Sequence, residues 1–276
     1  MKRIFCALFA LLTMTALLFG CGCTNKPVLR VAMSPDFAPM EFVDPSKTGQ
    51  AQFVGFDVSL AKYLAQGLGM ELEIVPMSFE DCQDALADGE VHMAISGFSW
   101  LPQREEQFNL SITYHAGDNS ANQVLLTREE NAAIFSSPDA FSGVMVGAQN
   151  ASLQEWLVQE QLPEAYLLTY QDLDKGLQLL HDNTIRAMAV AEGNANAILA
   201  SSSGFAKAAF RFQISEELTD NLILLPKGED QLTERVNELL RKAESAGYYP
   251  QWYAQALQQA GIEVHYGSEG HTADEE

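Results

Sequence analysis

Residues 55–76, with the sequence GFDVSLAKYLAQGLGMELEIVP, combine a helical pattern with a strand pattern. Apolar residues recur at helical spacing over residues 56–68, and glycines on both sides of the last leucine indicate where the helix ends. Residues 72–76 form a short β-rich run, and residues 28–33 form another before the helix. A strand, a helix and a second strand in this order predict a βαβ unit and therefore a parallel sheet.

The same pattern recurs farther along the chain. Capping-box residues open three more predicted helices: Ser78 with Asp81, Ser152 with Glu155, and Thr169 with Asp172. The further predicted strands are residues 91–96, 144–148, 165–169 and 185–190, and the last two predicted helices are residues 230–245 and 249–260. Because strands and helices alternate in two sets, the chain is expected to form two α/β lobes.

Two segments are expected to link these lobes. Residues 122–127 would cross from the first lobe to the second, and residues 222–226 would cross back. Two linking strands permit hinge closure over a ligand, so the cleft between the lobes is the expected binding site. The predicted division is residues 28–121 and 227–265 for lobe 1, and residues 122–226 for lobe 2 with the hinge strands.

The N-terminal residues have the composition of a secretory signal peptide. Two basic residues at positions 2 and 3 precede an apolar run at residues 4–19. This run is shorter than the roughly 20 apolar residues of a membrane-spanning helix. We therefore expect residues 1–20 to be removed on export.

The sequence LFGC at residues 18–21 resembles the bacterial lipobox, in which the cysteine becomes the acylated N-terminus. This resemblance implies that Cys21 is a lipid anchor and that residues 21–27 form a tether. Acylation at Cys23, or an ordinary signal peptide with an incidental cysteine, are the alternatives. A diacylated Cys21 would hold the protein on the periplasmic or extracellular face of the cell membrane.

The chain is acidic, with a formal net charge of −21 that becomes −23 once Lys2 and Arg3 leave with the signal peptide. Such a chain repels phosphate backbones, so nucleic acid is not an expected partner. Cys82 is the one cysteine beyond the tether and the five histidines are scattered, so we expect no disulfide framework, no metal and no cofactor. Residues 266–276 are predicted to form a disordered acidic tail.

Four segments carry a resemblance to a known family. They are SPDFAPMEF at residues 34–42, GFDV at 55–58, ADGEVHMAISG at 87–97 and SGFSWLPQR at 96–104. Their wording and order resemble the polar amino acid family (family 3) of bacterial extracellular solute-binding proteins of ABC transporters. The resemblance covers residues 28–257. It implies an α/β, type II periplasmic-binding-protein-like fold, with two lobes whose parallel-rich sheets are joined by two hinge strands.

The segment ending in Arg104 is similar to the family's turn between a strand and a helix, whose arginine holds the α-carboxylate of the ligand. A guanidinium offers a planar fork that can form two charge-assisted hydrogen bonds with a carboxylate. The resemblance also places Ser96, Gly97 and Ser99 in the site, where backbone N–H groups near a helix start would face the anion. The alternative for Arg104 is a solvated side chain paired with a neighbouring glutamate.

The second lobe carries two further candidates. Residues 147–155, GAQNASLQE, resemble the family's second anion-facing turn, which implies that Ser152 reaches the same carboxylate. Ser152 is equally explained as a helix N-cap, worth about 1 kcal/mol. Glu192 stands where the family has an aspartate that receives the ligand's ammonium group. Its alternative is an exposed acid at the start of a helix.

Phe37 and Phe79 match aromatic positions that enclose the ligand side chain in the family, although they could equally belong to the core. Leu101 and Leu153 depart from the pattern, because the family often has threonines there. An acidic residue recognising basic side chains would fall near Ser34. Its neutrality favours ligands other than lysine and arginine, although Asp36 is close enough to weaken that inference.

The resemblance implies a protein that captures an amino acid-like ligand and delivers it to an ABC transporter permease, and that is not an enzyme. The alternative is a secreted cyclohexadienyl or prephenate dehydratase-like enzyme on the same fold, which needs a general acid in the cleft. Glu192 and Glu41 could be nominated for that role. A sensory input domain is a third class, disfavoured because an acidic tail follows the last helix.

Overall fold

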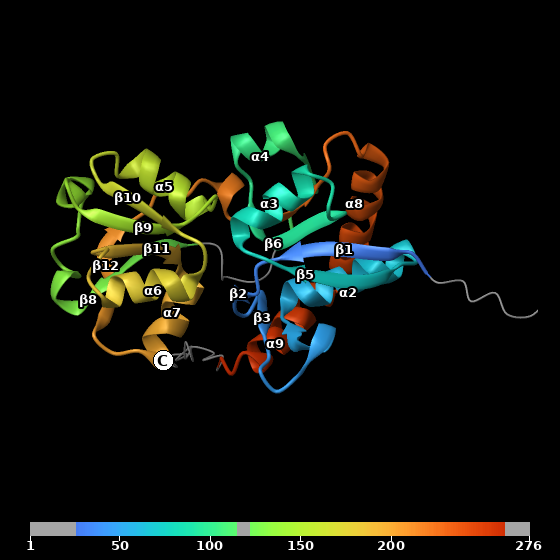
Figure 1. Ribbon diagram of the computed structural model, residues 1–276, viewed down its shortest axis with the longest axis horizontal. Helices are drawn as coiled ribbons and strands as arrows, with labels where there is room; N and C mark the ends of the chain where they lie inside the picture. The colour runs from blue at the N-terminus through green and yellow to red at the C-terminus, as the bar shows by residue number, and fades with distance from the viewer. Residues whose placement is uncertain (1–25, 115–121, 263–276) are drawn as a thin grey trace, which may run out of the picture.

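The computed structural model describes residues 26–114 and 122–262. The predicted signal peptide, Cys21 and the acidic tail lie outside the described residues. Two lobes, each built around a sheet, lie side by side (Figure 1). None of the helices in the described ranges combines the length and apolar character needed to cross a bilayer.

The first lobe contains a five-stranded sheet with the order β5-β1-β6-β13-β7. β1 pairs in parallel with β5 and β6, and β13 runs antiparallel to β6 and β7. The strands are β1 (Val28–Met33), β5 (Glu71–Pro76), β6 (Met93–Ser99), β7 (Asn109–Leu110) and β13 (Asn221–Leu225). The helices are α2 (Phe56–Leu68), α3 (Phe79–Ala87), α4 (Pro102–Gln107), α8 (Asp230–Ser245) and α9 (Tyr248–Gln259).

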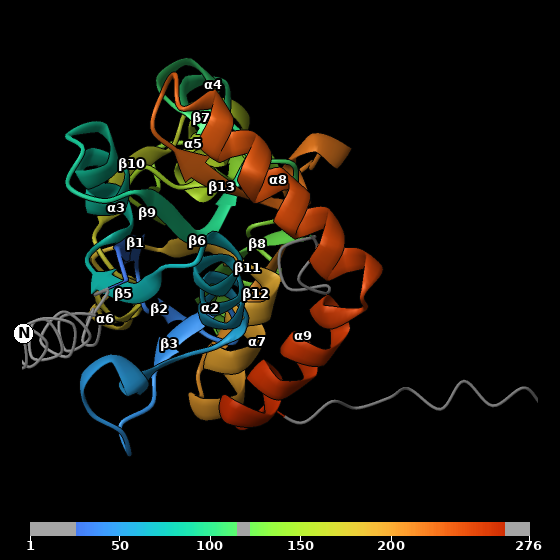
Figure 2. The ribbon, with the colours of Figure 1, turned by 90° about the vertical axis from the view of Figure 1, so that its right-hand side faces the viewer.

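Helix α2 shows why this sequence folds as predicted. Its buried face carries Phe56, Leu60 and Leu64, all fully buried in the core of the lobe. It ends at Gly69, whose left-handed conformation (φ 73°) lets its N–H bond the last carbonyls of the helix. The C-terminal helices α8 and α9 run along one side of this lobe (Figure 2), and Trp252 of α9 packs edge-on against Phe56.

The second lobe contains a five-stranded sheet with the order β10-β9-β11-β8-β12. β9 pairs in parallel with β10 and β11, and β8 runs antiparallel to β11 and β12. The strands are β8 (Gln123–Arg128), β9 (Met145–Gln149), β10 (Tyr166–Tyr170), β11 (Ala187–Ala191) and β12 (Phe205–Arg211). The helices are α5 (Leu153–Gln161), α6 (Leu173–His181) and α7 (Glu192–Ser201).

A small antiparallel sheet in the first lobe carries side chains toward the second. Its strands are β2 (Asp36–Phe37), β3 (Glu41–Val43) and β4 (Phe53–Val54). Short 3₁₀ helices occupy Gly49–Gln52, Glu129–Asn131, Pro138–Phe141 and Glu216–Leu218. Backbone bonds between Tyr114 and Asn221 join the two chain segments that lead to and from the second lobe.

The predicted bounds of α2 and α8 are confirmed, and three other details need correction. The strand predicted at residues 91–96 runs to Ser99, because Asn221 and Leu222 of β13 extend the pairing. The cap of α6 is Asp172, whose carboxylate accepts the N–H of Lys175, and not Thr169, which lies in β10. The two segments expected to cross between lobes are themselves sheet strands: β8 belongs to the second sheet and β13 to the first.

Candidate ligand-binding site

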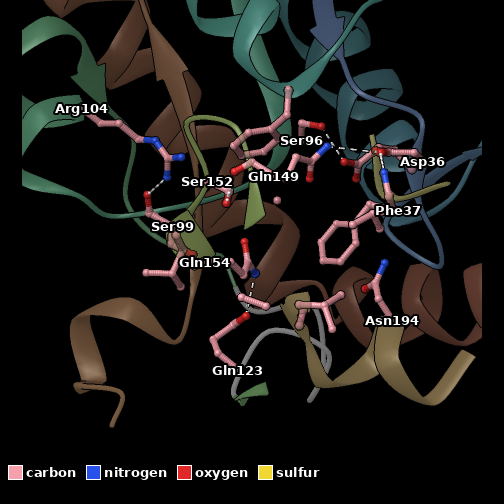
Figure 3. Close-up of a pocket in the computed structure, with 18 residues that line it drawn as sticks. Asp36, Phe37, Ser96, Ser99, Arg104, Gln123, Gln149, Ser152, Gln154 and Asn194 are labelled. Carbon is pink, nitrogen blue, oxygen red and sulfur yellow. Dashed lines mark hydrogen bonds between the residues drawn. The ribbon is translucent and has the colours of Figure 1, made fainter. Parts of the chain in front are cut away.

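A small enclosed pocket lies between the two lobes (Figure 3) and encloses about 50 Å³. Pockets that bury a small ligand usually measure about 300–1,000 Å³, so the lobes must separate for a ligand to enter. The first lobe contributes Asp36, Phe37, Glu41, Phe79, Ser96, Gly97, Ser99 and Arg104. The second contributes Gln123, Gln149, Ser152, Leu153, Gln154, Leu173, Ala189, Val190, Ala191 and Asn194.

Arg104, on helix α4, is the one basic residue among the described residues that line the pocket, and it is 2% exposed. Its Nη1 donates to the carbonyl of Ser99 at 2.6 Å and its Nη2 to the carbonyl of Ala151 at 2.7 Å. Its Nε donates to Oε1 of Gln83 at 3.2 Å. All three acceptors are uncharged, and no carboxylate in the described ranges pairs with the guanidinium.

Two aromatic rings flank the same guanidinium. Its central carbon lies 5.5 Å from the ring centre of Phe79 and 5.1 Å from that of Phe98. Burial lowers the pKa of Arg104 to about 9, which leaves the group charged at neutral pH. The alternative pairing with Glu105 does not form, because the guanidinium is buried and bonded to Ser99, Ala151 and Gln83. A buried cation without an anion is a strong candidate for holding a ligand carboxylate.

Asp36, on β2, bridges the two lobes. Its Oδ1 accepts from the hydroxyl of Ser34 at 3.0 Å. Its Oδ2 accepts from Nε2 of Gln149 at 3.2 Å and from the backbone N–H of Leu173, the first residue of α6, at 3.0 Å. Burial raises the pKa of Asp36 above its usual value, against the effect of these hydrogen bonds. Its carboxylate is therefore already occupied by protein donors.

Glu41 and Asp57 form a buried acidic pair behind the pocket. Glu41 is 1% exposed; its Oε1 accepts from the hydroxyl of Ser96 at 2.6 Å, and its carboxyl also interacts with the carboxyl of Asp57. Asp57 accepts from the N–H of Gly97 at 2.8 Å and from the phenol of Tyr114 at 2.9 Å. Burial, and then the charge of Asp57, raise the pKa of Glu41 well above its usual value, and burial raises the pKa of Asp57 to about 6.

The aromatic candidates serve the core and the pocket together. Phe79 packs against Phe98 with ring centres 4.6 Å apart and also lines the pocket. Phe37 lies over Gly97, where a Cβ would come within 2.8 Å of the ring atom Cε1. Gly97 also has φ 59°, so its left-handed backbone conformation and the lack of room for a Cβ both favour glycine at this position. Trp100 is partly buried and does not line the pocket.

The second lobe faces the pocket with hydroxyl and amide groups. Ser152 caps α5, since its hydroxyl accepts from the N–H of Glu155 at 3.1 Å and donates to the carbonyl of Gln149 at 2.6 Å. Gln154 donates to the side-chain oxygen of Gln123 at 2.6 Å. Among the described residues that line this side, no carboxylate is present. No group of three His, Cys, Asp or Glu side chains in the described ranges could hold a metal ion.

The sequence model of the bacterial extracellular solute-binding proteins, family 3, matches residues 29–259. The chain belongs to this family. A solved structure of an amino acid ABC transporter substrate-binding protein from Streptococcus pneumoniae, AbpA bound to L-arginine, is 28% identical with a TM-score of 0.75. It covers 86% of this chain and 97% of that one. The likeness confirms the predicted type II periplasmic-binding-protein fold.

Two curated relatives are similar over part of this family 3 protein. The arginine-binding extracellular protein ArtP of Bacillus subtilis (strain 168) is 33% identical over 156 residues, which cover 54% of this chain and 57% of the relative. The cyclohexadienyl dehydratase of Pseudomonas aeruginosa is 30% identical over 145 residues, which cover 52% of each. The matches thus span about half the length of these curated relatives.

The structure places Glu192 outside the residues that line the pocket of this family 3 protein. Glu192 does not line the pocket; its carboxylate accepts from Nζ of Lys207 at 2.6 Å and from Nδ2 of Asn122 at 2.9 Å. The bond from Lys207 lowers its pKa. Strand β11 ends at Ala191, which faces the pocket, and Glu192 begins helix α7.

Sequence reasoning did not assign a binding role to several lining residues of this family 3 protein. Glu41 was considered only as a catalytic acid, although it lies inside the segment used for the resemblance. Gln149 and Gln154 belong to the quoted second turn, so their position in that motif was an available signal. Gln123 and Asn194 had no such signal, because only the fold brings β8 and α7 to the pocket.

Proposed function

We propose that this chain is a solute-binding protein that closes over a small amino acid-like ligand and delivers it to an ABC transporter permease. The observation that carries this proposal is the guanidinium of Arg104, buried in a pocket between two lobes and paired with no carboxylate of the described residues. A ligand carboxylate would supply the missing anion through two charge-assisted hydrogen bonds. Ser96, Gly97, Ser99 and Ser152 line the same pocket and belong to the proposed site.

L-Arginine is the first ligand to test. The relatives named above include proteins described as binding arginine. Asp36 and Glu41 give this pocket two acidic side chains, which suit a basic ligand. The neutrality of Ser34 is therefore a poor guide to the charge of the ligand, because the acidic side chains that line the pocket, Asp36 and Glu41, lie two and seven residues farther along the chain.

The proposed setting is the outer face of the cell membrane, after removal of residues 1–20 and acylation of Cys21. The family is described as extracellular, which supports export. Metabolic labelling with a radioactive fatty acid should mark the wild-type protein and not Cys21→Ser. If Cys21→Ser is labelled as strongly as the wild type and Cys23→Ser is not labelled, the acylated residue is Cys23.

A thermal-shift screen of residues 24–276 against the standard amino acids tests the binding function. A ligand at 100 times its dissociation constant stabilises the folded state by about 2.7 kcal/mol. Binding and recovery of an unchanged amino acid support the transport role. No shift with any amino acid would contradict it.

A dehydratase is the second candidate function, favoured by Glu41. Its carboxyl lies in the same pocket as Arg104, and burial raises its pKa, as a general acid requires. The similarity to a cyclohexadienyl dehydratase supports testing prephenate as substrate. Consumption of prephenate by the wild type and not by Glu41→Gln would establish the enzyme and replace the transport proposal.

A further inference from the structure

An open groove of about 700 Å³ lies on the outside of the first lobe and shares no lining residue with the pocket between the lobes. It runs between α2 and α9, which Figure 2 shows on the side of the lobe that also carries α8. Its described lining contains three aromatic rings, one lysine and no carboxylate, in a chain whose formal net charge is −21. The groove therefore differs in character from the acidic chain around it.

The three rings of this groove form one cluster. The ring centre of Tyr63 lies 5.6 Å from that of Tyr248 and 5.5 Å from that of Trp252, and the last two are 5.5 Å apart. Trp252 also packs edge-on against Phe56 of the core, whereas Tyr248 is 36% exposed. Tyrosine and tryptophan are enriched at membrane–water interfaces, where one end of the ring is in an apolar layer and the other is in water.

Lys62, next to Tyr63 on α2, supplies the charge of the groove. Among the described residues no ion pair involves Lys62, whereas Arg235 on the neighbouring helix α8 is paired with Glu238. A lysine can lay its aliphatic stem along apolar surface and keep its ammonium group in the polar layer of a membrane. Because the described lining contains no carboxylate, this ammonium group is available to a lipid phosphate.

The predicted tether leaves the fold beside one end of the groove. The N–H of Glu71 donates to the carbonyl of Pro27 at 2.9 Å. Gly67 lines the groove and precedes Glu71 by four residues, so the two lie within about 15 Å of each other. The stretch from Cys21 to Pro27 spans at most about 20 Å. A bilayer that holds an acylated Cys21 is therefore within reach of the groove, and Val28, 41% exposed, adds an apolar side chain at the same edge.

We propose that this groove is a membrane-contact surface, through which the anchored protein rests on the headgroup layer of an anionic bilayer. The rings of Tyr63, Tyr248 and Trp252 enter the headgroup layer, and Lys62 pairs with a lipid phosphate. Apolar contact and electrostatic attraction together supply a second membrane signal beside the acyl chains. All described lining residues of the groove belong to the first lobe, so the second lobe stays free to open and close the pocket. This inference rests on the proposed lipid anchor and goes beyond the proposed binding function.

A chemically tethered protein tests the contact independently of acylation in the cell. The chain from Cys21 onward, with Cys23→Ser, is coupled through the thiol of Cys21 to a maleimide lipid. The vesicles contain phosphatidylcholine and phosphatidylglycerol at 7:3, and part of the phosphatidylcholine carries a nitroxide quencher on its headgroup. Cys82 is buried and does not compete for the maleimide.

Tryptophan fluorescence then reports which face meets the lipid. Replacing Trp100 and Trp156 by phenylalanine leaves Trp252 as the single tryptophan, and the matched control keeps Trp156, on α5 of the second lobe, in place of Trp252. We expect the nitroxide to quench Trp252 at least twofold and to leave Trp156 almost unchanged. Unquenched Trp252 in protein that floats with the vesicles would overturn the inference and leave the groove to a protein partner. Equal quenching of both would also overturn it, because no face would then be preferred.

A charge reversal tests the role of the lysine. Lys62→Glu should lower the quenching of Trp252 at least twofold, because it removes an attraction to phosphatidylglycerol and adds a repulsion. Lys175→Glu, on α6 of the second lobe, changes the net charge equally and should leave the quenching as it was. Equal effects of the two substitutions would overturn the contact through Lys62. Absence of fatty-acid labelling in cells would remove the natural anchor, whereas loss of quenching in the coupled protein would overturn the contact alone.

Discussion

The guanidinium of Arg104 donates to the carbonyl oxygen of Ala151 across the two lobes, at 2.7 Å. The residue proposed to hold the ligand is thus also a contact between the lobes. Ala151 has φ 57° and lies in the turn before helix α5, so this carbonyl is presented by an unusual backbone conformation. Closure of the lobes and capture of a carboxylate are therefore expected to depend on the same side chain.

Asp36 makes the second set of contacts between the lobes, and Asp36→Asn should weaken closure. An amide offers one acceptor oxygen where the carboxylate offers two, and three donors now converge on it. We expect the ligand-free variant to have a larger radius of gyration than the wild type in small-angle X-ray scattering.

Asp172→Asn is the matched control for Asp36→Asn. Helix α6 begins with Leu173, which donates to Asp36. Asp172 caps this helix by accepting from the N–H of Lys175, and asparagine is an equally good cap. The control should keep the dimensions of the wild type. Identical scattering from all three proteins would show that Asp36 does not hold the lobes together.

Gly97→Ala should reduce both stability and ligand affinity. The new Cβ would meet the ring of Phe37 at 2.8 Å, and the residue would have to keep φ 59°. A non-glycine residue in this region costs about 1–2 kcal/mol before the clash is counted. Thermal unfolding and calorimetric titration measure the two effects.

Gly143→Ala provides the control for backbone strain alone. Gly143 has φ 69°, and no atom lies within 4 Å of the position of its Cβ. This variant should lose stability and keep the affinity of the wild type. If Gly97→Ala also keeps full affinity, Phe37 does not contact the ligand.

The acidic pair of Glu41 and Asp57 should make the ligand-free protein less stable as the pH rises. Both carboxyls have a pKa above the usual value because they are buried, so the folded state binds more protons than the unfolded state. The stability gained from these protonated carboxyls is fully present below about pH 4. The contribution of Asp57 is lost as the pH rises through its pKa of about 6, and that of Glu41 is lost as the pH rises through its raised pKa. Asp36 and Cys82 face the same region and are also buried.

Glu41→Gln should flatten this dependence, because one carboxyl can no longer lose a proton. Relative to the wild type, the variant is expected to be more stable at pH 8 than at pH 4. Urea unfolding at both values provides the measurement. A parallel pH dependence in the two proteins would show that Glu41 is already ionised in the folded state.

Hydrophobic periodicity predicted the bounds of the helices that bury a long apolar face. Residues 56–68 and 230–245 form helices with the expected bounds, because their apolar faces pack into one core. Thr169 and Asp172 are both good caps three residues apart. The sequence could not choose between them, because pairing of β10 with β9 places Thr169 in the sheet.

Site residues were predictable where a sequence motif determines the backbone conformation. They were less predictable where a shift of one residue changes which side chain faces the pocket. Arg104 lines the pocket, as its turn implied. Glu192 and Ala191 are neighbours, and Ala191 lines the pocket whereas Glu192 begins helix α7. The buried position of Glu41 depends on a short sheet and on Ser96, 55 residues away, which no local pattern reveals.

Calorimetric titration of the wild type and Arg104→Ala with L-arginine tests the central claim most directly. Loss of this buried side chain and of its hydrogen bonds to Ser99, Ala151 and Gln83 should lower the unfolding midpoint, so the affinity is measured at a temperature at which the variant is folded. The account predicts binding to the wild type and a loss of at least about 100-fold in the variant, from the missing charge-assisted bonds. Equal affinity in a folded Arg104→Ala variant would contradict it.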